Sequence, residues 1–211
     1  MRNTVKYLIF LIIYLACGGN LQAQNYTFRN VVMSDGLSGL LVNTIYKDSE
    51  GFVWLGTDNC LDRFDGVKVR HFEFRGIESG RKKRVNSVTE TASKQLWVGN
   101  GIGLWRLNRT NSQLERIVPE KIDFAVNTLL ANEDVLYIGT EKGLFIHKDG
   151  QLLQVLTDRN MLAACNRIMD ICLNEDKTVL WLATVQGLFS YSLKDGKIDS
   201  WHFQENVPEA D

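Results

Sequence analysis

The sequence predicts an all-β protein built from repeated antiparallel units, and three observations lead to this prediction. The 211 residues include 17 glycines but only two prolines, a balance that favours many tight turns. Aromatic residues make up 10% of the chain and fall in short apolar runs, which is typical of strands rather than long helices. One sequence pattern also returns four times at nearly constant spacing.

Composition and charge narrow the class of protein. With 45% hydrophobic and 23% charged residues, the chain has the balance of a folded globular protein. The net charge is -1, from 24 basic and 25 acidic residues, so the chain has no general positive field that would attract nucleic acid or anionic lipid. We therefore expect no nucleic-acid partner.

The first 23 residues have the pattern of a secretory signal peptide. Arg2 and Lys6 supply a positive start, an apolar run of eleven residues extends from Tyr7 to Cys17, and a small residue, Ala23, precedes a polar segment. The apolar run is well short of the roughly 20 residues that a membrane-spanning helix needs. We expect cleavage after Ala23 and a periplasmic mature chain, with lipid attachment at Cys17 as the alternative.

Two markers define the repeat. Aromatic anchors stand 43, 40 and 44 residues apart, at Trp54, Trp97, Tyr137 and Trp181. Asparagines precede them at spacings of 43, 41 and 39 residues, at Asn43, Asn86, Asn127 and Asn166. A period of 40 to 45 residues with four short β runs predicts the blade of a β-propeller. We expect the aromatic anchors to fill the space between neighbouring blades.

The first unit shows the expected elements in order. The strands are predicted over Val42–Lys47, Phe52–Thr57, Leu61–Phe64 and Val67–Phe74. An Asp-Gly turn separates the last two, and the same signal returns at residues 149–150 and 195–196. Gly103, Gly143 and Gly187 fall between the second and third strands, where we expect positive φ. Cys60 takes that place in the first unit, so that turn either differs or is strained.

The opening of the chain resembles a known family. The run Val32-Met33-Ser34-Asp35-Gly36-Leu37-Ser38, four residues after Phe28, and the run from Asn43 to Thr57 resemble the start of two-component regulator propeller repeats. The resemblance implies the periplasmic sensor of a hybrid two-component system, non-enzymatic in this segment and responsive to carbohydrate. In that family two propellers, an immunoglobulin-like domain and a membrane helix precede a histidine kinase and a DNA-binding regulator. An oligosaccharide or other small ligand, and the remaining propeller and kinase parts, are the implied partners.

Four units are about half of a seven-bladed propeller, so we expect an incomplete propeller from a truncated sensor. The expected divisions are a signal peptide at 1–23, an N-terminal closing strand and entry motif at 24–42, and blades at 43–85, 86–126, 127–165 and 166–211. An incomplete propeller leaves blade faces unpaired, which predicts a marginal or homo-oligomeric chain. The alternative is a closed four-bladed propeller, in which residues 26–31 pair with the last blade.

Several chemical motifs are more simply explained by structure. Cys60, Cys165 and Cys172 lack the spacing of a metal site, so the sequence predicts no metal and no cofactor. The glycines of residues 99–103 lie in a repeat turn with no helix after them, which argues against a phosphate loop. Asp48 faintly resembles the Asp box of sialidase propellers, but it lacks a paired carboxylate and is expected to accept backbone hydrogen bonds.

The sequence also predicts where a ligand would bind. No catalytic role is expected for His71, His147 or His202. The loops entering each inner strand, at 75–85, 117–125 and 157–165, should share one face with the turns between second and third strands, and loops on a rigid scaffold often carry function. The candidate ligand-binding residues on this face are Arg81, Arg84, Asn100, Lys142, Arg159 and Gln186. A propeller lyase or glycosidase, and a stand-alone secreted interaction propeller, remain the alternatives to a sensor.

Overall fold

The structure is a computed structural model that describes residues 6–7, 28, 30–77, 83–117, 122–155 and 167–201. The chain divides into two compact units, Met1–Asn30 and Val31–Asp211, and the fold below is that of the second. The predicted signal peptide, including Cys17, lies outside the described residues apart from positions 6 and 7. No helix among the described residues is long and apolar enough to cross a membrane.

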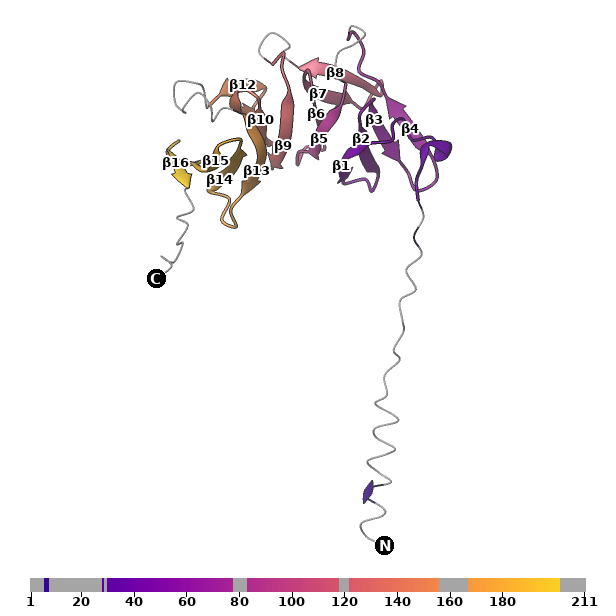
Figure 1. The fold of residues 1–211 in the computed structure, drawn as a ribbon, viewed down its shortest axis with the longest axis horizontal. Coiled ribbons are helices and arrows are strands. Elements are labelled where there is room, and N and C mark those ends of the chain that lie inside the picture. Colours follow the sequence, from indigo (N-terminus) through magenta and orange to yellow (C-terminus); the bar gives the residue numbers. More distant parts are fainter. Residues whose placement is uncertain are drawn as a thin grey trace, which may run out of the picture. The chain divides into compact units, whose positions relative to one another are not determined.

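The described residues form four separate antiparallel sheets, each with four strands in chain order, here called blades 1 to 4 (Figure 1). Blade 1 contains β1 (Val42–Lys47), β2 (Val53–Thr57), β3 (Leu61–Phe64) and β4 (Val69–Phe72), and blade 2 contains β5 (Val85–Glu90), β6 (Leu96–Asn100), β7 (Gly103–Asn108) and β8 (Gln113–Ile117). Blade 3 contains β9 (Val126–Asn132), β10 (Val135–Thr140), β11 (Gly143–Lys148) and β12 (Gln151–Gln154), and blade 4 contains β13 (Ile168–Leu173), β14 (Val179–Thr184), β15 (Gly187–Ser192) and β16 (Ile198–Trp201). A 3-10 turn, η1 (Met33–Asp35), precedes blade 1.

The inner strands of successive blades contact one another in chain order, β1 with β5, β5 with β9 and β9 with β13 (Figure 1). Of the proposed closing segment, residues 28, 30 and 31 are described and belong to no strand. The prediction of an all-β, incomplete propeller is therefore confirmed, and the described residues supply no closing strand for the four-bladed alternative.

The blades repeat a β-bulge near the start of each inner strand. The register of each inner strand skips one residue there, and the four skipped residues are Asn43, Asn86, Asn127 and Met169. Such a bulge leaves one side chain out of the ladder and bends the strand. The expected fourth asparagine marker was wrong, because Met169 holds the equivalent position and Asn166 lies outside the described residues.

Two of the bulged asparagines link neighbouring blades. Asn86 Nδ2 donates to the carbonyl of Val126 at 2.9 Å, and Asn127 Nδ2 donates to the carbonyl of Ile168 at 2.8 Å. Each acceptor is the first residue of the next inner strand. The asparagine repeat in the sequence therefore has a structural reason, which is to hold consecutive inner strands together.

The core consists of three hydrophobic clusters, each formed between two consecutive blades. The aromatic anchors Trp54, Trp97 and Tyr137 are buried in the first, second and third clusters in chain order. Trp181 is only half-buried. The reason is that each anchor packs toward the following blade, and the described residues form no fifth blade.

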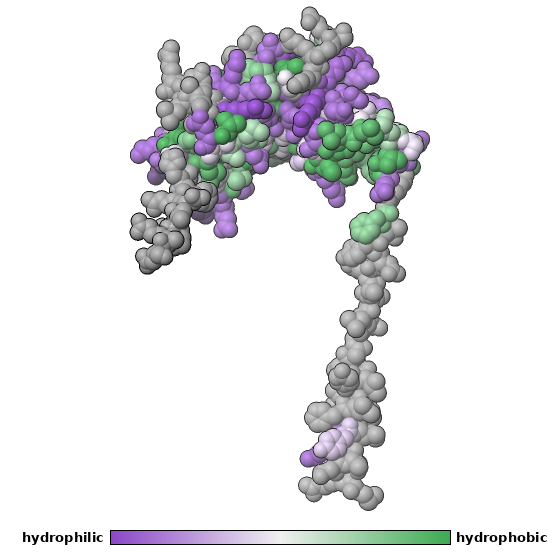
Figure 2. All heavy atoms as spheres, viewed as in Figure 1, coloured by the Kyte–Doolittle hydropathy of each residue, from purple (hydrophilic) through white to green (hydrophobic). Residues whose placement is uncertain are grey.

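The face of blade 1 that points away from blade 2 is exposed, because the described residues form no blade before blade 1. Val88, Leu129 and Ile171 occupy equivalent register positions and are 5%, 7% and 6% exposed, because each packs against the preceding blade. Ile45 holds the same position in blade 1 and is 69% exposed. Leu40, Leu41 and Val42 are exposed beside it, and Figure 2 shows hydrophobic surface gathered over this end.

The turns between second and third strands show whether Cys60 is strained or whether its turn differs from the others. Gly103, Gly143 and Gly187 have φ of 147°, 110° and 131°, so the predicted positive φ is confirmed. Cys60 does not have positive φ. The first turn differs instead, since three residues separate β2 from β3 in blade 1 and two residues separate the equivalent strands in the other blades.

Candidate ligand-binding groove

A groove of about 560 Å³ opens over the beginnings of the inner strands, with lining residues from all four blades. Three amide side chains line it, from the bulged residues Asn43, Asn86 and Asn127. Four charged residues, two basic and two acidic, and one aromatic residue complete its chemistry, namely Arg84, Arg167, Asp123, Glu141 and Phe124. The bulges therefore help to build the groove, because they turn these amides out of the strand ladder.

Repeated hydrogen bonds position the rim of this groove. The backbone N–H of Gly101 donates to the carbonyl of Arg84 at 3.2 Å, and that of Glu141 donates to the carbonyl of Ala125 at 3.2 Å. The equivalent bond in blade 4 joins Val185 to Arg167 at 3.4 Å. These bonds hold the last residue before each of these three inner strands beside the turn between second and third strands, on one face of the blades.

Phe124 is the aromatic element of the groove and is partly exposed. Its ring lies 5.9 Å from that of Phe145, and Lys142 Nζ lies 4.7 Å from its centre. The neighbouring Asp123 accepts a hydrogen bond of 2.6 Å from Arg116, which also donates to the carbonyl of Ile102. Residues 122–125, directly before β9, are thus fixed by packing and by a charged hydrogen bond.

Asn43 differs from its two counterparts. Its Nδ2 is buried and finds no hydrogen-bond partner in the described part of the chain, whereas those of Asn86 and Asn127 donate to the following inner strand. An unsatisfied buried amide group is costly.

Of the six predicted ligand-binding residues, one lines the groove, two are exposed in turns, one is buried and two lie outside the described residues. Arg84 is exposed and lines the groove. Lys142 is exposed in the β10–β11 turn against Phe124, and Gln186 is exposed in the β14–β15 turn. Arg81 and Arg159 lie outside the described residues.

Asn100 requires a correction, because it is completely buried and does not present its amide to solvent. Its Oδ1 accepts hydrogen bonds of 3.1 Å from the backbone of Ile102 and from the indole N–H of Trp105. Thr140, at the equivalent position in blade 3, donates to the carbonyl of Gly143 across the same turn. Asn100 is therefore a turn-stabilising residue.

Asp123, Phe124 and Arg167 were not among the predicted ligand-binding residues. Asp123 and Phe124 lie within a loop that the sequence assigned to the binding face, but Arg167 lies beyond the expected loop at 157–165. The sequence nevertheless contained a signal that could have identified Arg167. Arg167 directly precedes the first apolar residue of its inner strand, as Arg84 does in blade 2.

Comparison with known proteins gives matches in sequence and in fold. Residues 36–59 match the family model of the two component regulator propeller. A stretch of 66 residues is 36% identical to "Histidine kinase P4" of Formosa agariphila, covering 31% of this chain and 5% of that protein. The matched family segment includes β1, β2 and the turn before Cys60.

Solved structures share the fold. They include the extracellular domains of two proteins of B. thetaiotaomicron described as hybrid two component systems, with TM-scores of 0.64 and 0.67 at 24% and 20% identity. These alignments cover 79% and 83% of this chain but 23% and 26% of those domains. Virginiamycin B lyase from Staphylococcus aureus also matches, with a TM-score of 0.64 at 12% identity over 80% of this chain and 58% of the lyase.

The chain thus spans about a quarter of the extracellular domains that it resembles. The family-model match falls on the start of blade 1 and the segment before it. Residues 36–59 thus match the two-component regulator propeller family model, and the chain shares its fold with the extracellular domains of hybrid two-component systems.

Proposed function

We propose that this chain is a ligand-sensing propeller segment of a periplasmic sensor in a hybrid two-component system. The observation that carries the proposal is the groove over the inner strands, since it draws polar groups from all four blades onto one concave surface. The two-component regulator propeller repeat and the fold shared with extracellular sensor domains support the same role.

The chemistry of the groove favours a neutral, hydroxyl-rich ligand such as an oligosaccharide. Arg84 and Arg167 are balanced by Asp123 and Glu141, so the groove has no excess of either sign. Amides and charged groups together can donate to and accept from hydroxyls. A partly exposed aromatic ring, Phe124, can pack against the apolar face of a sugar ring.

Ligand binding in this groove can act on the arrangement of the blades. Asn86 and Asn127 already link consecutive inner strands through their amides. A ligand that contacts these residues and Asn43 would favour one spacing of the inner strands over others, and it would shift the population of blade arrangements accordingly. The attached signalling parts of a sensor would then respond to that shift.

The enzymatic alternative has less support. The likeness to virginiamycin B lyase is at 12% identity, a level that indicates shared fold and does not carry over the lyase's activity. The described residues that line the groove include no histidine and no cysteine.

Binding measurements on the secreted chain test the proposal. A panel of oligosaccharides is screened by isothermal titration calorimetry against the wild type and against Arg84→Ala, Glu141→Ala and Arg167→Ala. Asp65→Ala and Asp195→Ala, in exposed turns between third and fourth strands, are matched controls. We expect an affinity loss of about tenfold or more from the groove variants, as for a lost charged hydrogen bond. Equal losses from both sets, or no loss from the groove set, would exclude the groove as the site.

A further inference from the structure

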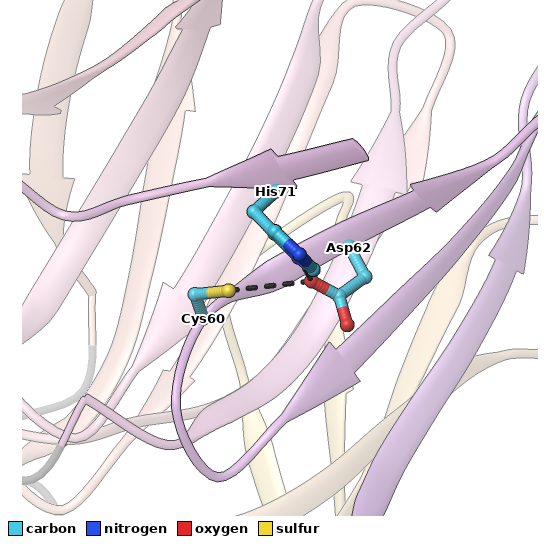
Figure 3. Close-up of side chains that lie close together, drawn as sticks. All are labelled: Cys60, Asp62 and His71. Carbon is cyan, nitrogen blue, oxygen red and sulfur yellow. Dashed lines mark hydrogen bonds and ion pairs between the residues drawn. The ribbon is translucent and has the colours of Figure 1, made fainter. Parts of the chain in front are cut away.

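Three side chains of types that bind metal ions converge in blade 1 (Figure 3). None of them lines the groove. Cys60 comes from the turn between β2 and β3, Asp62 from β3 and His71 from β4. One ligand atom from each residue lies within 4.8 Å of the other two. Cys60 Sγ is 3.3 Å and His71 Nδ1 is 2.7 Å from the same oxygen, Asp62 Oδ1.

The geometry of the sheet explains this convergence. Residues two apart in an extended segment point to the same side, which brings Cys60 beside Asp62. His71 is the direct cross-strand partner of Asp62 in the β3–β4 ladder. Directly opposite residues on adjacent strands have neighbouring side chains, so the third group joins the first two on one face.

The propeller repeat does not require these residues. At the position of Cys60 the other blades have the positive-φ glycines of the turn, Gly103, Gly143 and Gly187. At the position of Asp62 they have aromatic residues, Trp105, Phe145 and Phe189. At the position of His71 they have Arg116, Gln154 and Ser200. Blade 1 therefore departs from the repeat at three positions that meet in space.

Hydrogen bonds already orient the Asp62 carboxylate so that one of its oxygens faces the other two side chains. Asp62 is completely buried, and its Oδ2 accepts hydrogen bonds from the backbone N–H and hydroxyl of Ser38, at 2.8 Å and 2.7 Å. Its other oxygen, Oδ1, faces Cys60 and His71. Outer hydrogen bonds of this kind fix a metal ligand in position before the ion arrives.

The cluster can also be reached. A pocket of about 280 Å³ lies beside it, and its lining includes Ser38, Cys60, His71 and the exposed Glu73. Water or the Glu73 carboxylate can supply a further ligand from this side. Cys60 and Asp62 are buried while His71 is exposed, so the cluster combines a shielded interior with an open entry.

We propose that Cys60, Asp62 and His71 form a Zn²⁺ site with an open fourth position. Zn²⁺ binds thiolate sulfur at about 2.3 Å, imidazole nitrogen at about 2.0 to 2.1 Å and carboxylate oxygen at about 2.0 to 2.2 Å, usually in a tetrahedron. In a tetrahedron those bond lengths place nitrogen and oxygen roughly 3.3 to 3.5 Å apart and sulfur and oxygen roughly 3.5 to 3.7 Å apart. The observed 3.3 Å between Sγ and Oδ1 is a few tenths of an ångström short, and the 2.7 Å between Nδ1 and Oδ1 must lengthen further.

The choice of ion follows from the mixed ligand set. Thiolate and imidazole favour Zn²⁺ over Mg²⁺ or Ca²⁺, which prefer oxygen ligands alone. On binding, the thiol of Cys60 releases its proton to solvent. The imidazole of His71, whose Nδ1–H now donates to Asp62, exchanges that proton with solvent so that a bare Nδ1 binds the ion and Nε2 carries the single ring proton. The Zn²⁺ charge replaces the hydrogen bonds that now join these groups to Asp62.

The test uses the full secreted chain, cleared of metal with a chelator and kept reduced without added thiols. Zn²⁺ binding is measured by calorimetry, and Co²⁺ is added separately because thiolate ligation gives a charge-transfer absorption. Cys60→Ser and His71→Asn each keep a hydrogen-bonding group near Asp62 but weaken or remove a ligand. Cys172→Ser, which changes an exposed cysteine in blade 4, is the matched control.

We expect one Zn²⁺ per chain in the wild type and in Cys172→Ser, with at least tenfold weaker binding in both cluster variants. The Co²⁺–thiolate absorption should disappear in Cys60→Ser. Circular dichroism confirms that each variant is folded. The proposal is overturned if the folded wild type binds no Zn²⁺, if either cluster variant binds as tightly as the wild type, or if the Co²⁺ signal depends on Cys172. In those cases the three residues form a hydrogen-bond network alone.

Discussion

The indole N–H of Trp54 donates a hydrogen bond of 2.8 Å to Oδ2 of Asp48, and both side chains are buried. The other carboxylate oxygen, Oδ1, accepts from the backbone N–H groups of Glu50 and Phe52 at 3.1 Å and 2.9 Å. Asp48 thus closes the β1–β2 turn and holds the first aromatic anchor in place. This confirms its predicted role as an acceptor of backbone hydrogen bonds in its own turn.

The Asp48→Ala substitution should lower the free energy of unfolding by about 2 kcal/mol or more, because it leaves the buried indole N–H without an acceptor. Urea denaturation followed by tryptophan fluorescence measures the change. Asp65→Ala is the control, since Asp65 also accepts two backbone N–H bonds but is exposed to solvent. A loss from Asp48→Ala no larger than that from Asp65→Ala would contradict the buried role.

Replacing Ile45 with serine should increase the fraction of monomer. Ile45 is 69% exposed at a position that is buried in the other three blades, so we expect chains to associate through this face. Light scattering after size-exclusion chromatography, at several concentrations, measures the distribution. Val67→Ser is the control, because Val67 is 71% exposed in the β3–β4 turn. A wild-type chain that is monomeric at every concentration, or an equal effect of Val67→Ser, would refute this expectation.

The two described cysteines should differ sharply in reactivity. Burial raises the pKa of the Cys60 thiol to about 12, so almost no thiolate is present at neutral pH. Cys172 is exposed. Alkylation of the folded protein at pH 8, mapped by peptide mass spectrometry, should modify Cys172 at least tenfold faster than Cys60. Denaturant should remove the difference, and comparable rates in the folded state would show that Cys60 is accessible.

Acidification should destabilise the fold partly through His147. Burial lowers the pKa of His147, and the positive charge of Arg106 lowers it further, while the imidazole packs 4.8 Å from the ring of Trp97. Since the folded pKa is below the unfolded value of about 6.5, the unfolded state takes up the proton first as the pH falls. Stability from the neutral imidazole is therefore complete above about pH 6.5 and declines below it.

The measurement for His147 compares melting temperatures of the wild type and His147→Gln between about pH 8 and pH 5. The variant should lose less stability than the wild type over the acidic half of this range, because glutamine does not titrate. Identical pH profiles for the wild type and His147→Gln would exclude this contribution.

Much of the fold could be predicted because each blade is specified locally. Asp-Gly turns, positive-φ glycines and alternating apolar residues recur within about 40 residues, and each sheet pairs only strands that follow one another in the chain. Patterns of this kind can be read without knowing the neighbours of a blade. The same reasoning failed for the fourth asparagine, because the register of the β13 bulge places Met169, not Asn166, at the equivalent position.

The sequence by itself determined the repeat, the strand order within each blade and the face on which loops and turns meet. Only the tertiary structure decided that Asn100 is buried and hydrogen-bonded to Trp105, that Ile45 is exposed, and that Arg167 reaches the groove. It also decided that Cys60 and His71 meet at Asp62. The physical reason is that these outcomes depend on strand register and on contacts between residues in different strands or blades, whereas turns and strands follow from the preferences of neighbouring residues.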